Sequence, residues 1–227
     1  MGIAFVTSLL IGAVSYTVIG RFRKCTKKLK IISECEFAEI MRILSKRIFL
    51  QLFSLAQVSA RIVPKSDDNK FKSIRFDNPA IRDLLAFCQQ SVLEQFHIST
   101  NDLEHAQSLY YKKGNGELDI IVDSIALMFD QFADGSFPVL PSEVAPESSP
   151  PADSNQLLEL LSTILMAKAE NGPDQVDEDA IMSQHGHTSA ISFYNQVAKR
   201  LQNDAEFRNG LIQILVKNQT IVRSNLE

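Results

Sequence analysis

The stretch FAEIMRILSKRIFLQLFSLA, residues 37–56, is the best guide to the fold of this chain. Its apolar side chains recur at steps of three and four residues, which places them along one face of an α-helix. Residues 48–56 are apolar almost all round, yet nine residues are too few to cross a bilayer. The stretch predicts a central, buried helix of a bundle that runs from the preceding basic flank to Ile62, before Pro64. Its apolar positions are Phe37, Ile40, Met41, Leu44, Ile48, Leu52 and Leu55.

Local signals mark the ends of the next helices. Pro79 occupies the favoured first position of a helix that follows Asn78. Ser99, with Asp102 three residues later, resembles a capping box that starts a short helix. Residues 114–116, Gly-Asn-Gly, then break the chain ahead of the cleanest helical stripe, in residues 118–132. No convincing β pattern appears, so the sequence predicts an all-α fold with an irregular helical bundle in residues 21–133.

Residues 134–154 hold five of the eight prolines and predict an extended, semi-rigid linker rather than a helix. Beyond it, residues 155–227 form a smaller C-terminal helical segment, with a first helix that ends at Asn171 and two further helices around residues 191–201 and 207–215. About 70 residues are marginal for an independent domain. We therefore expect this segment to dock on the first bundle or on a partner.

The first 20 residues contain no charged side chain. At about 1.5 Å per residue, a helix of this length spans roughly 30 Å, the thickness of a hydrocarbon core. The sequence predicts a single transmembrane anchor over residues 1–20. Ser8 and Gly12, four residues apart, provide a small-residue face for packing against partner helices in the membrane.

Basic residues follow the apolar stretch at once, and their predicted place is the membrane interface, at the lipid headgroups. The charge is asymmetric along the whole chain: residues 1–75 carry 14 Lys/Arg and 5 Asp/Glu, whereas residues 76–227 carry 9 and 22. The positive-inside rule predicts a body on the cytosolic side, or on the matrix side of an organelle's inner membrane, with the mitochondrion and the endoplasmic reticulum as candidate organelles. The interface residues are Arg21, Arg23, Lys24, Lys27, Lys28 and Lys30.

Two other interpretations of the N-terminal segment stay open. A cleaved secretory signal normally begins with basic residues, which here come afterwards, although cleavage near residues 13–15 is conceivable. A first helix buried in a soluble core is the second alternative. Nucleic acid is a poor partner, because the basic cluster lacks interleaved aromatic residues and the body is acidic.

Motifs for chemistry are weak throughout. The sequence contains no nucleophile elbow, phosphate loop or zinc-protease helix, which leaves no positive grounds for an enzyme. The three cysteines form no Cys-x-x-Cys pair. His185 and His187 are two imidazoles near acidic residues, but no spacing rule joins them to a third ligand, so a polar loop is expected there. No catalytic residue, cofactor or metal site is predicted.

These features favour a membrane-anchored, non-catalytic adaptor, assembly factor or accessory (supernumerary) subunit of an organellar membrane complex. Its expected partners are membrane lipid and other protein subunits of helical structure, with no nucleic acid. The alternatives are a helical protein that handles lipid or a small ligand, and a soluble helical interaction protein whose first helix is buried.

Overall fold

The computed structural model describes residues 29–62, 79–144, 153–171, 176–187 and 189–224. Within these ranges the regular structure is helical throughout, and no strand occurs. The predicted all-α class is therefore confirmed for the described part of the chain. Its helices are α2 (Glu34–Ile62), α3 (Pro79–Gln95), α4 (Thr100–Tyr110), α5 (Gly116–Ala133), α6 (Ser154–Asn171), α7 (Glu178–Gln184), α8 (Ala190–Asn203) and α9 (Ala205–Ser224).

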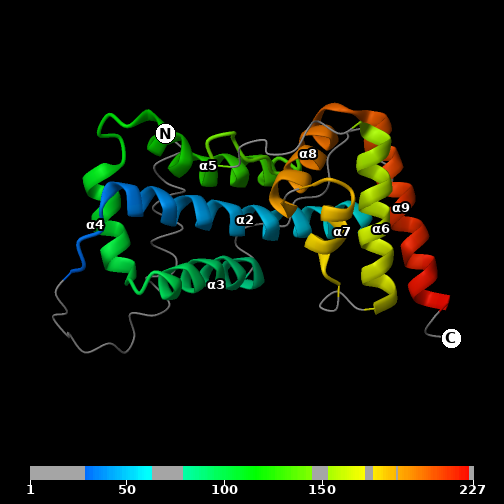
Figure 1. The fold of residues 1–227 in the computed structure, drawn as a ribbon, viewed down its shortest axis with the longest axis horizontal. Coiled ribbons are helices and arrows are strands. Elements are labelled where there is room, and N and C mark those ends of the chain that lie inside the picture. The colour runs from blue at the N-terminus through cyan, green and yellow to red at the C-terminus, as the bar shows by residue number, and fades with distance from the viewer. Residues whose placement is uncertain (1–28, 63–78, 145–152, 172–175, 188, 225–227) are drawn as a thin grey trace.

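Helix α2 is the central element. It packs against α3, α4 and α5 and also against α8 and α9, so it joins the two halves of the chain. In Figure 1, α3 and α5 run on opposite sides of α2, α4 crosses near its N-terminal end, and α6 and α9 stand side by side near the other end. Phe37, Ile48, Phe49 and Leu52 are fully buried. The periodicity and the apolar centre of this stretch therefore led to the right prediction.

Most predicted helix boundaries are confirmed. Helix α3 begins at Pro79 and α6 ends at Asn171. Ser99 and Asp102 form the predicted capping box at the start of α4. The start of α2 differs from the prediction, because residues 29–33 are not helical and the helix begins only at Glu34. Acidic residues in its first turn favour that start, since they interact well with the positive end of the helix dipole.

Helix α7 was not predicted from the sequence. Its seven residues give too little periodicity to mark a helix, and only Met182 among them is buried. The start is fixed by Asp177, whose side chain accepts a hydrogen bond from the Ala180 N–H at 3.0 Å. A capping aspartate in an acidic stretch is easily mistaken for an ordinary loop residue.

The first part of the predicted proline-rich linker is packed into the protein. Phe137, Leu140 and Val144 are buried, although residues 135–140 form no regular structure. Their backbone groups find partners on the helices: Gln131 accepts from the Val139 N–H at 2.8 Å, and Gln202 donates to the Phe137 carbonyl at 2.7 Å. Proline prevents a helix here but does not prevent burial once the polar backbone is satisfied.

The C-terminal helices dock on the first bundle. The Phe53 ring of α2 lies 5.2 Å from the Tyr194 ring of α8, centroid to centroid. Helices α6 and α9 also pack closely on each other. A Cβ atom added to Gly210 of α9 would lie only 2.7 Å from Leu158 Cδ1 of α6, so the absence of a side chain permits this close approach.

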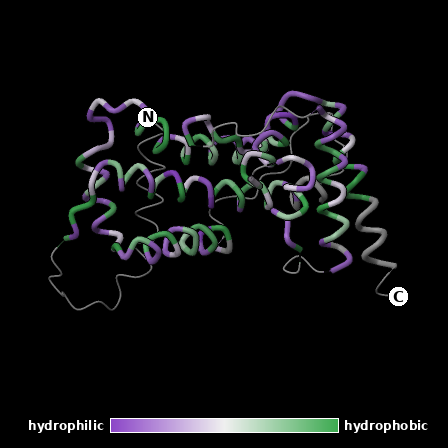
Figure 2. The backbone as a smooth tube through the Cα atoms, viewed as in Figure 1, coloured by the Kyte–Doolittle hydropathy of each residue, from purple (hydrophilic) through white to green (hydrophobic). Residues whose placement is uncertain are grey.

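No helix in the described part is both long enough and sufficiently apolar to cross a membrane. In Figure 2, polar and apolar residues are interspersed along these helices. The predicted anchor, residues 1–20, lies outside the described residues, as do Ser8 and Gly12.

Candidate functional site

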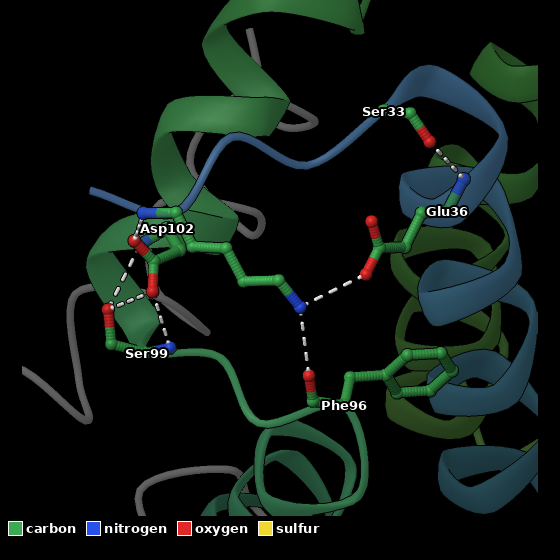
Figure 3. A network of polar contacts seen from close by, with 6 residues as sticks. Ser33, Glu36, Phe96, Ser99 and Asp102 are labelled. Atoms are coloured by element: carbon green, nitrogen blue, oxygen red, sulfur yellow. Dashed lines mark hydrogen bonds and ion pairs between the residues drawn. The ribbon is translucent and has the colours of Figure 1, made fainter. Parts of the chain in front are cut away.

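A group of polar contacts around Lys30 attaches the first described residues to the helical body. The Lys30 backbone N–H donates to Asp102 Oδ1 at 2.7 Å, while its ammonium donates to Glu36 Oε1 and to the Phe96 carbonyl, both at 3.2 Å. Figure 3 shows that these partners come from the first turn of α2 and from the region where α3 gives way to α4. We call Lys30, Glu36, Phe96, Ser99 and Asp102 the entry clasp.

Asp102 is the centre of the entry clasp. Its Oδ2 accepts from the Ser99 N–H at 2.8 Å and from the Ser99 hydroxyl at 2.6 Å, and its Oδ1 accepts from Lys30. Burial of this carboxyl raises its pKa, but the hydrogen bonds from Ser99 and Lys30, together with the Lys30 charge, lower it more, and the net pKa lies below the ordinary value. One aspartate therefore caps α4 and holds the incoming chain.

A second attachment lies two residues further along. The Ile32 side chain is only 2% exposed, and the Tyr110 hydroxyl donates to the Ile32 carbonyl at 3.0 Å. The Tyr110 ring also lies 6.1 Å from the Phe37 ring, centroid to centroid. The incoming segment thus contacts both ends of α4: Lys30 at its start and Ile32 at its end.

The attachments differ in strength. The Lys30–Glu36 ion pair is 44% and 32% exposed on its two side chains, and such surface pairs contribute about 0–1 kcal/mol. A hydrogen bond to a charged, buried acceptor such as Asp102 contributes about 1.5–3 kcal/mol, and burial of an isoleucine contributes about 1.5–3 kcal/mol. The Asp102 contacts and Ile32 therefore fix the chain more firmly than the ammonium does.

The Asp102 carboxylate is fully engaged in this attachment. Both Asp102 oxygens already accept hydrogen bonds within the protein. Elsewhere in the described ranges, no three His, Cys, Asp or Glu side chains are grouped so that they could hold a metal ion. His185 is exposed, whereas His187 is buried with its ring edge against Phe193, at 5.2 Å between centroids.

Of the predicted interface residues, the structure describes only Lys30, which lies in the entry clasp. Arg21, Arg23, Lys24, Lys27 and Lys28 lie outside the described residues. The sequence revealed the capping role of Asp102 through its spacing from Ser99, but not its bond to Lys30. That contact joins residues 72 positions apart, and no local pattern encodes such a distance.

The described part of the chain is thus an all-helical body with a central buried helix and a firmly attached entry segment. Comparisons with protein-family models, with curated proteins and with solved structures find no match.

Proposed function

We propose that this protein is a membrane-anchored, non-catalytic helical adaptor, assembly factor or accessory subunit of an organellar membrane complex. The observation that carries the proposal is the entry clasp, which fixes Lys30, the last residue of the basic cluster, to the body. Lys30 lies ten positions after Gly20, and even a fully extended chain of that length reaches only about 35 Å. A body attached in this way stays close to the surface that holds residues 1–20.

The proposed mechanism is confinement. An uncharged segment of 20 residues enters the bilayer, and the basic residues after it bind anionic headgroups. The short tether limits the body to a thin layer at the membrane, which raises its effective concentration toward partners in that layer. A rigid attachment also limits which face of the body those partners meet.

The orientation follows from the positive-inside rule, which gives a body on the cytosolic or matrix side. Translation of the full chain with microsomes tests both anchor and orientation. We expect carbonate-resistant pelleting, a protease-accessible body and no glycan at Asn218, which heads the single Asn-x-Ser/Thr sequon of the chain. A protected, glycosylated body would contradict the orientation, and full release by carbonate would contradict the anchor.

A matched variant isolates the anchor from the body. Leu9→Arg combined with Leu10→Arg places two charges at the centre of the uncharged segment, each costing about 2.5–3.5 kcal/mol there. We expect this double variant to lose carbonate resistance, whereas Lys113→Arg, in the loop between α4 and α5, retains it. Migration of the wild-type chain with a large complex in mild detergent then supports the accessory subunit, and migration as a small species supports the adaptor.

A further inference from the structure

The outward face of α5 carries two exposed aliphatic side chains in register. Ile120 is 41% exposed and Leu127 is 48% exposed. They are seven residues apart, which is two helical turns, so both side chains lie on one face about 10 Å apart along the axis. The opposite face of α5 is core, with Ile121, Ile125 and Phe132 buried.

Carboxylates lie beside this aliphatic pair. Helix α5 contains Glu117, Asp119, Asp123 and Asp130, and no lysine or arginine. By helical spacing, Asp123 and Asp130 each follow an exposed aliphatic residue by three positions, which places them along the same side of the pair.

Two of these carboxylates are held in place by neutral donors of the preceding loop. The Lys112 backbone N–H donates to Asp119 Oδ1 at 2.7 Å, and the Tyr111 hydroxyl donates to Asp123 Oδ1 at 2.5 Å. Arg42 is paired with Glu117, and the Lys112 ammonium lies 4.9 Å from the centre of the Tyr111 ring. Helix α5 itself contributes four carboxylates and no cation, which makes its outward face acidic.

We propose that the outward face of α5 binds a basic amphipathic helix of a partner protein. Aliphatic side chains of that helix pack over Ile120 and Leu127, and its lysines or arginines pair with Asp123 and Asp130. Charge complementarity selects this occupant, because an acidic helix or an anionic lipid surface is repelled by the same carboxylates. The inference rests on the adaptor role proposed above and gives the chemistry of the partner.

The exposed apolar side chains of α3 and α9 lie on helices that also carry cations. Phe87 on α3 is exposed, but α3 carries both signs of charge, with Arg82 and Asp83 in its first turns. Ile212 and Val216 on α9 are also an exposed aliphatic pair in register, but Ile212 lies one turn from Arg208, a cation. The combination of an aliphatic pair in register with carboxylates beside it distinguishes α5 from these two helices.

A photo-crosslinking peptide tests the proposal on the full chain in mild detergent. The probe is an 18-residue helical peptide with leucines at three- and four-residue spacing, lysines on the flanks and one photoreactive phenylalanine. We expect saturable crosslinking to peptides from residues 116–133, identified by mass spectrometry and weakened as salt rises. The same probe with glutamate in place of lysine is expected to leave α5 unlabelled. Equal labelling by both probes, or labelling only outside residues 116–133, would overturn the proposal.

Matched variants separate this surface from the overall fold. Leu127→Lys and Asp130→Lys change exposed side chains of α5. Each is expected to raise the probe concentration required for half-maximal labelling by tenfold or more. Phe87→Lys, on α3, is the control and leaves labelling unchanged. Unchanged labelling in both α5 variants would also overturn the proposal. If the chain resists carbonate extraction but is not labelled at α5, the docking proposal is wrong and the anchor proposal stands. If the chain is labelled at α5 but is released by carbonate, only the anchor proposal is wrong.

Discussion

The side-chain amide of Asn195 on α8 makes two hydrogen bonds to the backbone of Leu140, one with its N–H and one with its carbonyl. Asn195 Oδ1 accepts from the Leu140 N–H at 2.8 Å, and Asn195 Nδ2 donates to the Leu140 carbonyl at 3.1 Å. Both residues are buried. Leu140 is buried but belongs to no helix, so its N–H and carbonyl need other hydrogen-bond partners. The Asn195 amide satisfies both groups, which allows the proline-rich segment to pack into the core.

Replacement of this amide is expected to destabilise the whole fold. Asn195→Ala leaves the Leu140 N–H and carbonyl without partners in a buried place, and each orphaned group costs about 1–3 kcal/mol. We expect a loss of about 2–5 kcal/mol in the free energy of unfolding, measured by urea denaturation. Asn203→Ala is the control, because Asn203 is exposed and its amide donates to the Lys199 carbonyl within the same helix. A loss no larger than that of the control would contradict this account of the segment.

A pair of buried serines lies where α2 and α5 touch. Ser45 Oγ is 2.8 Å from the Met41 carbonyl, and Ser124 Oγ is 3.0 Å from Ser45 Oγ and 2.7 Å from the Ile121 carbonyl. The acceptor carbonyls belong to the same helices and keep their helical bonds, so loss of both hydroxyls leaves no orphaned group. We expect Ser45→Ala/Ser124→Ala to change the free energy of unfolding by less than about 1 kcal/mol.

The same site is expected to reject a larger side chain. Ser124 is 2% exposed, and leucine there adds volume between two tightly packed helices. Overpacking of this kind typically costs about 1–3 kcal/mol. Urea denaturation measures the free energy of unfolding of both variants. A larger loss of this free energy in the double alanine variant than in Ser124→Leu would show that the serines act through hydrogen bonding rather than through their small size.

His187 is expected to make the fold sensitive to mild acid. Its Nδ1 atom is buried and has no hydrogen-bond partner among the described residues, and the pKa of the imidazole lies below 6.5 because burial disfavours the cation and the charge of His185 adds to this. The unfolded chain therefore binds the proton first. The contribution of neutral His187 to the free energy of unfolding is complete above pH 6.5. It decreases as the pH falls toward the folded pKa, with a slope of at most about 1.4 kcal/mol per pH unit.

Urea denaturation at pH 7.5 and at pH 5.5 measures this effect. We expect the wild-type chain to be less stable at the lower pH than at the higher one. His187→Leu is expected to lose less stability, because leucine at position 187 does not titrate. His105→Gln, which changes an exposed imidazole, is expected to retain the wild-type loss. An equal loss in all three chains would show that His187 titrates as it does in the unfolded chain.

The entry clasp is expected to depend on Asp102 more than on the Lys30 ammonium. Asp102→Asn replaces one of two accepting oxygens with a donor and lowers stability by about 1–3 kcal/mol at neutral pH. Lys30→Ala keeps the backbone N–H that donates to Asp102, and it is expected to cost less than about 1 kcal/mol. Urea denaturation of the two variants compares them directly, and a larger loss in Lys30→Ala would contradict the proposed ranking.

The Asp102 effect has a defined pH dependence. The folded pKa lies below 3.8, so the carboxylate stabilises the fold above pH 3.8 and this contribution is lost as the pH falls through the folded pKa. The difference in stability between wild type and Asp102→Asn is therefore expected to shrink below pH 3.8. A difference that stays constant from pH 7 down to pH 3 would indicate that the carboxylate charge does not matter.

Local features were predictable from the sequence, and long-range ones were not. The Ser99–Asp102 cap and the start of α3 at Pro79 depend on neighbouring residues, so their spacing identified them. The burial of Leu140 depends on an amide 55 residues away, and the bond from Lys30 to Asp102 spans 72 residues. Proline content indicates where a helix stops, but not whether the following segment is covered.

Energy transfer from a donor dye on Cys35 to acceptor headgroups in vesicles measures most directly whether the body lies at a membrane surface. Cys35 is exposed at the start of α2 and Cys88 is buried, so Cys25→Ser in the full chain leaves one reactive thiol. We expect strong transfer, and a clear decrease when 30 Gly/Ser residues, with a reach of about 30 Å, are inserted after Lys28. Transfer no stronger than that from a labelled soluble protein mixed with the same vesicles would contradict the membrane-anchored adaptor.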